Sequence, residues 1–169
     1  MFGQASAQQQ NYNATPPGMT ATVNDPVGPL PDGKSISFKA LKDVKFEGNL
    51  NAITLWGDPN KEGSAYAILQ RWMPGNFSSP HMHSQDRMIY VISGTWWVSD
   101  ATIKDERTTY PMPAGTYVTH PANTVHWDGN RAGAKEPAML LITGIGPARN
   151  TPVDEKGNPR PRPPGGRGE

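Results

Sequence analysis

Two stretches decide the fold: GNFSSPHMHSQDRMIYVISG at residues 75–94 and GTYVTHPANTVHWDGN at residues 115–130. Together they contain all four histidines of the chain. His81 and His83 are two positions apart, and in an extended strand residues i and i+2 point to the same face. The pair therefore offers two imidazoles side by side, the arrangement that suits two neighbouring metal ligands.

The sequence around these stretches is typical of a β protein. Between residues 34 and 147, short alternating or β-branched runs are separated by Gly and Pro, and no run keeps a 3.6-residue apolar period. We expect strands near 35–38, 50–56, 65–72, 88–92, 96–98, 116–120, 124–128 and 139–145. Ser93-Gly94-Thr95 is typical of a hairpin turn. The predicted fold class is all-β, a sandwich or a barrel.

Composition limits the classes of partner. The chain has 169 residues, no cysteine and a formal net charge of +1. This length favours one domain, and the lack of cysteine excludes disulfides and thiolate metal sites. A near-neutral charge gives no basis for expecting nucleic acid or an anionic membrane as partner, and no apolar run approaches the ~20 residues of a membrane span. We therefore expect a small molecule as the main partner.

Glycine and proline also divide the chain. Residues 1–33 read as an irregular N-terminal arm, residues 34–149 as the β domain, and residues 150–169 as a flexible tail rich in Pro, Gly and Arg. Ala5-Ser6-Ala7 has the small-x-small form of a signal-peptidase site. We expect either an exported protein, periplasmic or secreted, that retains the end of its signal, or a cytoplasmic protein with an ordinary N-terminus.

The spacing of glycine, histidine and proline in the two stretches resembles the two signature motifs of the cupin superfamily. The matching positions are Gly75, His81, His83 and Gly94 in the first stretch, and Gly115, Pro121, His126 and Asn130 in the second. The chain looks like a small single-domain bacterial metal-binding cupin. The resemblance covers residues 35–147 and implies a jelly-roll β-barrel that forms a homodimer.

The same resemblance implies a metal site. His81, His83 and His126 take the positions of the family's ligands and would hold one divalent transition metal per chain. Iron(II) is the metal we expect first, with zinc, manganese, nickel and copper as alternatives, because imidazole is a ligand that several of these ions share.

The chain departs from the motifs at two positions. Asn123 replaces a glycine, and Asn tolerates a left-handed backbone better than other non-Gly residues. Arg87 replaces the usual fourth ligand, a glutamate, and a guanidinium cannot ligate a cation. Three ligand sets remain open: the three histidines alone, a fourth oxygen ligand from Gln85 or Asp86, or His120 as the fourth ligand.

Arg87 and His120 are also candidate catalytic residues. Arg87 either points outward and pairs with Asp86 or Asp128, or points into the barrel and binds a substrate carboxylate through two hydrogen bonds. His120 is a proton shuttle, a group that supports the ligands, or a surface residue. Adjacent Trp96 and Trp97 must point to opposite faces, so only one of them can line a pocket with Tyr90 or Met139.

These residues favour a metal-dependent enzyme. Our first hypothesis is a mononuclear non-haem iron dioxygenase acting on a small acidic or enolic substrate, since three neutral imidazoles leave positions for substrate and dioxygen. The alternatives are a metal-dependent lyase, isomerase or decarboxylase, in which the metal acts as a Lewis acid, and a non-catalytic cupin that binds a small ligand or a metal.

Overall fold

A computed structural model describes residues 28–29, 37–38, 41, 44–47 and 51–160 of the chain. The chain divides into two compact units, Met1–Lys45 and Phe46–Glu169. In the first unit, β1 (Gly28–Pro29) and β2 (Ser37–Phe38) pair in antiparallel fashion. The strand expected near 35–38 therefore belongs to the first unit rather than to the β domain. The export motif at residues 5–7 lies outside the described residues.

The second unit is built from strands. Those described are β3 (Ala52–Gly57), β4 (Ala65–Trp72), β5 (His81–His83), β6 (Arg87–Ser93), β7 (Thr95–Ser99), β8 (Tyr110–Pro113), β9 (Tyr117–His120), β10 (Trp127–Gly129), β11 (Ala138–Ile145) and β12 (Asn150–Pro152). A single 3-10 turn, η2 (Glu106–Thr108), precedes β8. The described part of the chain contains no α-helix, and none of its helical segments is long and apolar enough to cross a membrane. The all-β prediction is confirmed.

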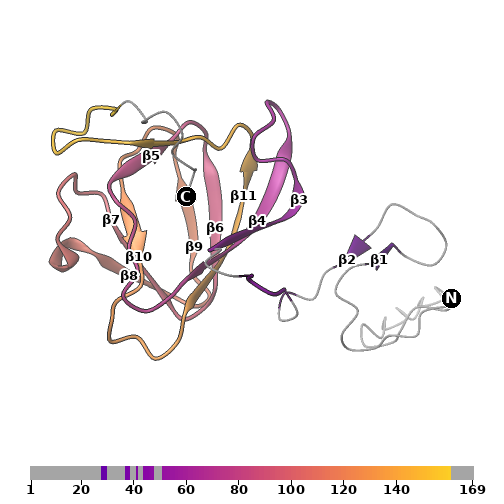
Figure 1. The fold of residues 1–169 in the computed structure, drawn as a ribbon, viewed down its shortest axis with the longest axis horizontal. Coiled ribbons are helices and arrows are strands. Elements are labelled where there is room, and N and C mark those ends of the chain that lie inside the picture. The colour runs from indigo at the N-terminus through magenta and orange to yellow at the C-terminus, as the bar shows by residue number, and fades with distance from the viewer. Residues whose placement is uncertain (1–27, 30–36, 39–40, 42–43, 48–50, 161–169) are drawn as a thin grey trace, which may run out of the picture. The chain divides into compact units, whose positions relative to one another are not determined.

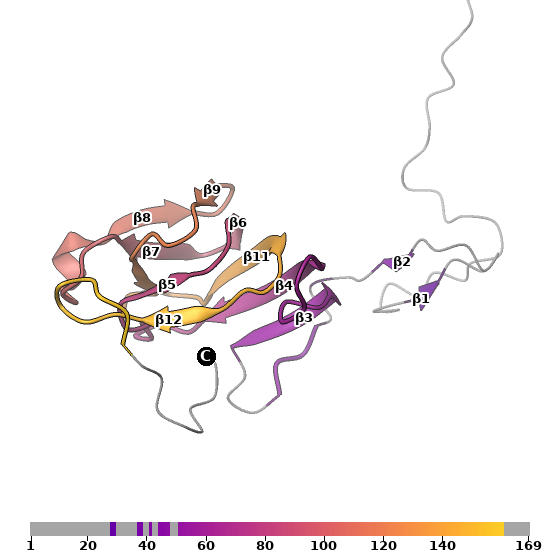
Figure 2. The ribbon, with the colours of Figure 1, turned by 90° about the horizontal axis from the view of Figure 1, so that it is seen from above.

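The strands form two layers (Figures 1 and 2). One layer is a five-stranded sheet in the order β3-β4-β11-β6-β9. The other layer consists of the sheet β10-β7-β8 and the pair β12-β5. Two isolated bridges, His81 to His126 and Phe77 to Gly129, connect these two parts. Neighbours that are distant in sequence, such as β4 beside β11, are typical of Greek-key and jelly-roll folds. The predicted jelly roll is confirmed.

The turn at Gly94 differs from the prediction. β6 pairs with β11 and β9, whereas β7 pairs with β10 and β8, so Gly94 carries the chain from one sheet to the other and no hairpin forms. Gly75, Gly94 and Gly115 all have positive φ, as does Asn123 at 59°. The expectation that asparagine could take over the missing glycine is confirmed.

The interior has an apolar end and a polar end. Alternate residues of β6 point inward, and Ile89 and Val91 are completely buried against Leu140 and Ile142 of β11. Each such side chain contributes roughly 1.5–3 kcal/mol of hydrophobic stabilisation. The next inward position toward the start of β6 is Arg87, where the interior becomes polar.

The β domain continues past residue 149. β12 pairs with β5, with Asn150 opposite His83 and Pro152 opposite His81, and Val153 is buried after it. The backbone N–H of Arg160 donates to the carbonyl of Pro152 at 2.8 Å. The tail predicted from residue 150 onward is therefore wrong for residues 150–160: β12 pairs with β5, and the following residues pair back onto Pro152 and Val153, which composition does not reveal.

A glycine in β10 allows the two halves of the second layer to meet. A Cβ at Gly129 would lie 2.1 Å from the backbone oxygen of Asn76 and 2.6 Å from Cδ1 of Phe77. We expect Gly129→Ala to lower the free energy of unfolding by about 3 kcal/mol or more, because backbone atoms cannot move aside cheaply. Gly133→Ala is the matched control, since nothing lies within 4 Å of a Cβ there. Equal urea midpoints for the two variants would contradict this close approach.

Candidate metal centre

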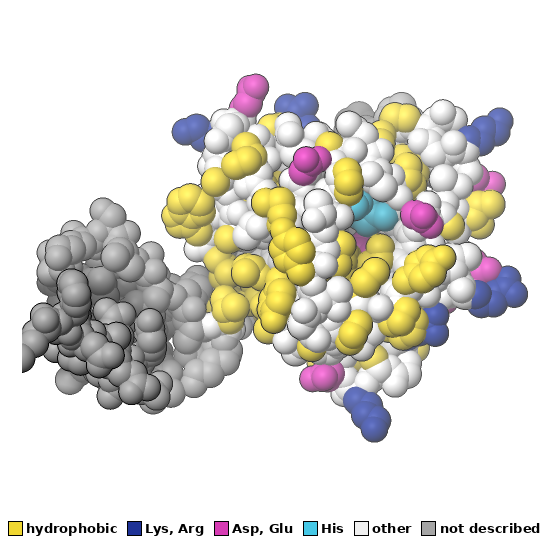
Figure 3. Space-filling model, turned by 180° about the vertical axis from the view of Figure 1, so that it is seen from behind, with side chains coloured by type: hydrophobic (Ala, Val, Ile, Leu, Met, Phe, Trp, Pro, Cys, Tyr) yellow, Lys and Arg dark blue, Asp and Glu magenta, His cyan; other side chains and the backbone are white. Residues whose placement is uncertain are grey.

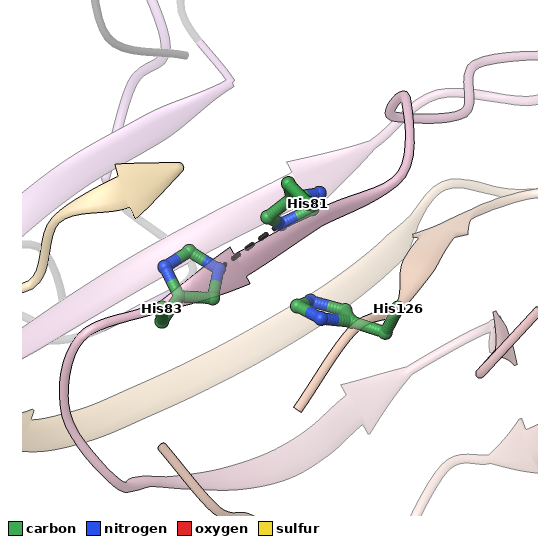
Figure 4. A group of neighbouring side chains, drawn as sticks. All are labelled: His81, His83 and His126. Carbon is green, nitrogen blue, oxygen red and sulfur yellow. Dashed lines mark hydrogen bonds between the residues drawn. The ribbon is translucent and has the colours of Figure 1, made fainter. Parts of the chain in front are cut away.

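Strand pairing brings three histidines to one face. The N–H of His81 donates to the carbonyl of His126 at 2.8 Å, and the N–H of His126 donates back at 2.9 Å. Residues directly opposite in an antiparallel pair project to the same side, and His83 follows on that side two residues later. Figure 4 shows the three imidazoles directed toward one another from β5 and from the segment before β10.

The three rings are buried and close together. Nε2 of His81 lies 3.0 Å from Nε2 of His83, and one ligand atom from each of the three residues lies within 4.8 Å of the others. The ring centroids of His81 and His126 are 4.2 Å apart. The structure thus brings His81, His83 and His126 together as one potential ligand set.

Backbone carbonyls fix the tautomers of two of these rings. Nδ1 of His81 lies 2.8 Å from the carbonyl of Ser79, and Nδ1 of His126 lies 3.3 Å from the carbonyl of Thr124. A carbonyl can only accept, so each Nδ1 carries the hydrogen and each Nε2 has a lone pair with which it can accept a hydrogen bond or bind an ion. Such outer hydrogen bonds orient histidine ligands in metal sites.

Two rings of the cluster are uncharged at neutral pH. Burial, together with Arg87, lowers the pKa of His83 to about 2. Burial also holds the pKa of His126 far below its usual value, and the neighbouring His81 adds to this effect. Neutral imidazole is the form that binds a metal ion.

One pair of donors has the spacing of two ligands on a divalent ion. Imidazole nitrogens bind such ions at about 2.1 Å, so two adjacent ligands at right angles are separated by about 3 Å. The 3.0 Å distance between the Nε2 atoms of His81 and His83 agrees with this value. Three nitrogen donors suit iron, zinc, nickel or copper, and the ligand type alone does not distinguish among these metals.

Arg87 faces the cluster. Its Nη2 lies 3.2 Å from Nδ1 of His120 and 3.5 Å from Nε2 of His126. The outward orientation considered for this residue is therefore wrong, because the alternation along β6 puts residue 87 on the same inner face as Ile89. Burial lowers the pKa of Arg87, but an arginine starts so high that the guanidinium stays charged.

A buried carboxylate partly offsets this charge without a direct ion pair. Asp128 accepts hydrogen bonds from the Ser78 hydroxyl at 2.9 Å and from the Trp96 indole N–H at 2.8 Å. Its charge opposes the effect of burial on the pKa of Arg87. Asp128 is thus held by neutral donors at a distance from the guanidinium.

His120 is buried beside the ligand set, so a surface role is wrong. Its ring centroid lies 3.9 Å from that of His126. Because Arg87 can only donate, Nδ1 of His120 is an acceptor and its hydrogen lies on Nε2, a buried atom without a hydrogen-bond partner. Burial and Arg87 lower the pKa of His120 to about 4.

The proposed oxygen ligands are not brought to the cluster. Gln85 and Asp86 are both exposed, in the turn between β5 and β6. Oδ1 of Asp86 accepts a hydrogen bond from the backbone N–H of Ala122 at 2.7 Å. Neither residue therefore joins the three histidines: Asp86 is turned outward by the inward register of Arg87, and Gln85 lies before β6, in the exposed turn.

The aromatic residues divide as the strand geometry requires. Trp96 is buried and points inward, whereas Trp97 lies under the guanidinium of Arg131 at 3.6 Å. Tyr90 is 45% exposed on the outer face of β6, and Met139 alternates with the buried Leu140. Of the four residues considered for a pocket, only Trp96 lies in the interior.

Histidine atoms are visible on one face of the molecule. Figure 3 shows them in a recess bordered by hydrophobic and uncharged atoms, with an acidic side chain beside them.

Two residues of the polar interior escaped the sequence analysis. Ser78 holds Asp128, and Tyr66 is a buried tyrosine whose hydroxyl has no hydrogen-bond partner. The alternation along β4, which also buries Trp72 on the same face, was the available signal for Tyr66. Nothing in the sequence indicated that its hydroxyl would lie near Arg87.

Comparison with known proteins gives a family match and several structural matches. A family profile described as "Cupin domain" matches residues 68–144. No curated protein matches the sequence significantly. A protein of unknown function with a cupin-like fold from Ralstonia eutropha matches with a TM-score of 0.51 and 18% identity, over 64% of this chain and 61% of that one.

Two further solved structures are less similar. A cupin 2 conserved barrel domain protein from Leptotrichia buccalis has a TM-score of 0.49 and 19% identity, over 65% of this chain and 48% of that one. A polyketide cyclase from Streptomyces resistomycificus has a TM-score of 0.41 and 18% identity, over 48% and 54%. The chain thus spans less than two thirds of each of these three proteins, and the likeness concerns the fold.

Proposed function

Because the chain belongs to the cupin superfamily and its barrel gathers three buried histidines, we propose that it is a metal-dependent enzyme, specifically a mononuclear non-haem iron dioxygenase. His81, His83 and His126 would hold the ion. Iron(II), when bound, supplies open positions at which an organic substrate and dioxygen can react together. The substrate would be a small acidic or enolic molecule.

One observation carries this proposal: a permanent cation replaces the usual acidic ligand. Nη2 of Arg87 lies 3.5 Å from Nε2 of His126. Three neutral ligands leave the full charge of a divalent ion uncompensated, and a neighbouring guanidinium adds to it. An anionic group between the two would relieve this repulsion, so the site favours a substrate with a carboxylate or an enolate.

The alternative chemistry, in which a metal acts as a Lewis acid for a lyase or isomerase, requires a base. The nearest candidates are already engaged: both oxygens of Asp128 accept hydrogen bonds, and Nδ1 of His120 accepts one from Arg87. His120 therefore presents an N–H to the interior, which can donate but not remove a proton. This supports oxidation over base-catalysed chemistry.

Oxygen consumption tests the proposal. We expect protein loaded anaerobically with iron(II) to consume dioxygen when mixed with members of a panel of small carboxylic acids and enols, followed with an oxygen electrode. Zinc-loaded protein is the control, because zinc has no redox chemistry, and should consume none. Turnover under strict anaerobiosis would favour the lyase or isomerase, and metal binding without turnover of any substrate would favour the non-catalytic alternative.

A further inference from the structure

A transverse row of residues crosses the inner face of the five-stranded sheet. Tyr66 of β4 lies opposite Gly144 of β11, Gly144 lies opposite Arg87 of β6, and Arg87 lies opposite His120 of β9. Neighbours in such a row project to the same side of the sheet. Three polar side chains therefore stand in one line, with a glycine between the first two.

Gly144 gives room to the Tyr66 hydroxyl. A Cβ at position 144 would lie 2.7 Å from the hydroxyl oxygen and 3.0 Å from the backbone oxygen of Asp86. The phenol thus reaches over the glycine, toward the strand that carries Arg87. The charge of Arg87 acts on the phenol, although burial dominates and raises the pKa of Tyr66. The hydroxyl is therefore a donor at neutral pH.

Two of the donors in this row that have no acceptor belong to Tyr66 and Arg87. Tyr66 is 2% exposed, and its hydroxyl has no hydrogen-bond partner. Nε of Arg87 is also buried without a partner, whereas its Nη2 faces the histidines. Buried donors without acceptors cost free energy, so proteins seldom keep them without a reason. A hydroxyl and a cationic N–H together are complementary to an oxyanion.

We propose that the Tyr66 hydroxyl and Nε of Arg87 form, across Gly144, the binding site for an oxyanion of the substrate, a carboxylate or enolate oxygen. This assignment rests on the proposed function and deepens it, because it adds Tyr66 as a substrate-binding residue and gives Gly144 a role in specificity. Arg87 is then shared: Nη2 holds His120 while Nε holds the ligand.

Binding of a simple carboxylate tests this site without any metal. The probe is acetate, titrated into metal-free protein and followed by NMR, with acetamide as the uncharged molecule of the same shape. We expect acetamide to bind at least tenfold more weakly than acetate. Tyr66→Phe should weaken acetate about tenfold, and so should Gly144→Ala, which keeps the hydroxyl but displaces it. Tyr90→Phe, at an exposed tyrosine, should change nothing.

Stability separates a binding role from a structural one. Since Tyr66→Phe removes a buried hydroxyl without a partner, we expect its urea midpoint to stay the same or rise. A lower midpoint with unchanged acetate affinity would overturn the proposal, as would equal binding of acetate and acetamide by the native chain. Metal content is measured on separate samples of the same variants, from which the metal has not been removed. A chain that binds acetate as predicted but holds no metal would contradict only the proposed function. A chain that holds metal but does not bind acetate as predicted would contradict only the oxyanion site.

Discussion

His126→Ala is expected to reduce the metal content of the purified protein to background, whereas the native chain carries one ion. The variant removes one of three converging nitrogens and leaves only the two ligands on β5. Loss of an outer partner of a ligand already costs roughly 10–100-fold in affinity, so loss of a ligand itself should cost more. Metal analysis after purification without added metal, followed by dialysis, measures the effect.

His120→Ala is the matched control. This residue is also a buried histidine, with its ring centroid 3.9 Å from that of His126, but it lies outside the converging set. We expect it to retain the metal. Full metal content in His126→Ala would eliminate the proposed site, and loss of metal in His120→Ala would make His120 a ligand. Circular dichroism of both variants verifies that the barrel has folded.

Acidification should destabilise the metal-free protein strongly. His83, His120 and His126 have pKa values lowered by burial, whereas in the unfolded chain a histidine titrates near 6.5. Below about pH 6.5 the unfolded state therefore binds more protons, and the free energy of unfolding falls as the pH falls. Each histidine that stays neutral in the folded state lowers the free energy of unfolding by about 1.4 kcal/mol per pH unit below pH 6.5. Three such histidines lower it by about 4 kcal/mol at pH 5.5. Urea unfolding at pH 7.5, 6.5 and 5.5 measures this loss.

Two aspartates with lowered pKa values affect the stability of the protein in a different pH range. The pKa of Asp105 is lowered to about 2 by its hydrogen bonds with Arg107, and that of Asp154 is lowered by hydrogen bonds with Asn158. Their contribution is lost only below about pH 4, so it does not overlap the histidine range. His120→Gln should reduce the slope between pH 6.5 and 5.5 by about a third. A stability that does not change over this interval would contradict the burial of neutral histidines.

Much of the site could be predicted because local patterns determine it. His81 and His83 share a face in any extended strand, and the alternation of β6 limits Arg87 to two orientations. The left-handed turn at Asn123 also followed from the residue type, and its N–H donates to the carbonyl of His83 at 2.8 Å. These features depend on a few neighbouring residues, for which backbone preferences are known.

What could not be predicted depends on register between distant strands. The choice between the two orientations of Arg87 follows from how β6 pairs with β11 and β9. The Tyr66–Gly144–Arg87 row requires two independent registers to coincide. The pairing of β12 with β5 could not be predicted because residues 150–152 show no alternation of apolar and polar residues. A shift of one residue in any of these pairings would exchange the faces.

The pairing of β5 with β12 has a consequence for biosynthesis. The strand that carries His81 and His83 leaves the ribosome about 70 residues before Asn150, its partner in the sheet, and well before His126. Domains form during synthesis only as fast as distant partners emerge. The three imidazoles can therefore converge only after His126 has emerged, more than 40 residues after the two histidines of β5.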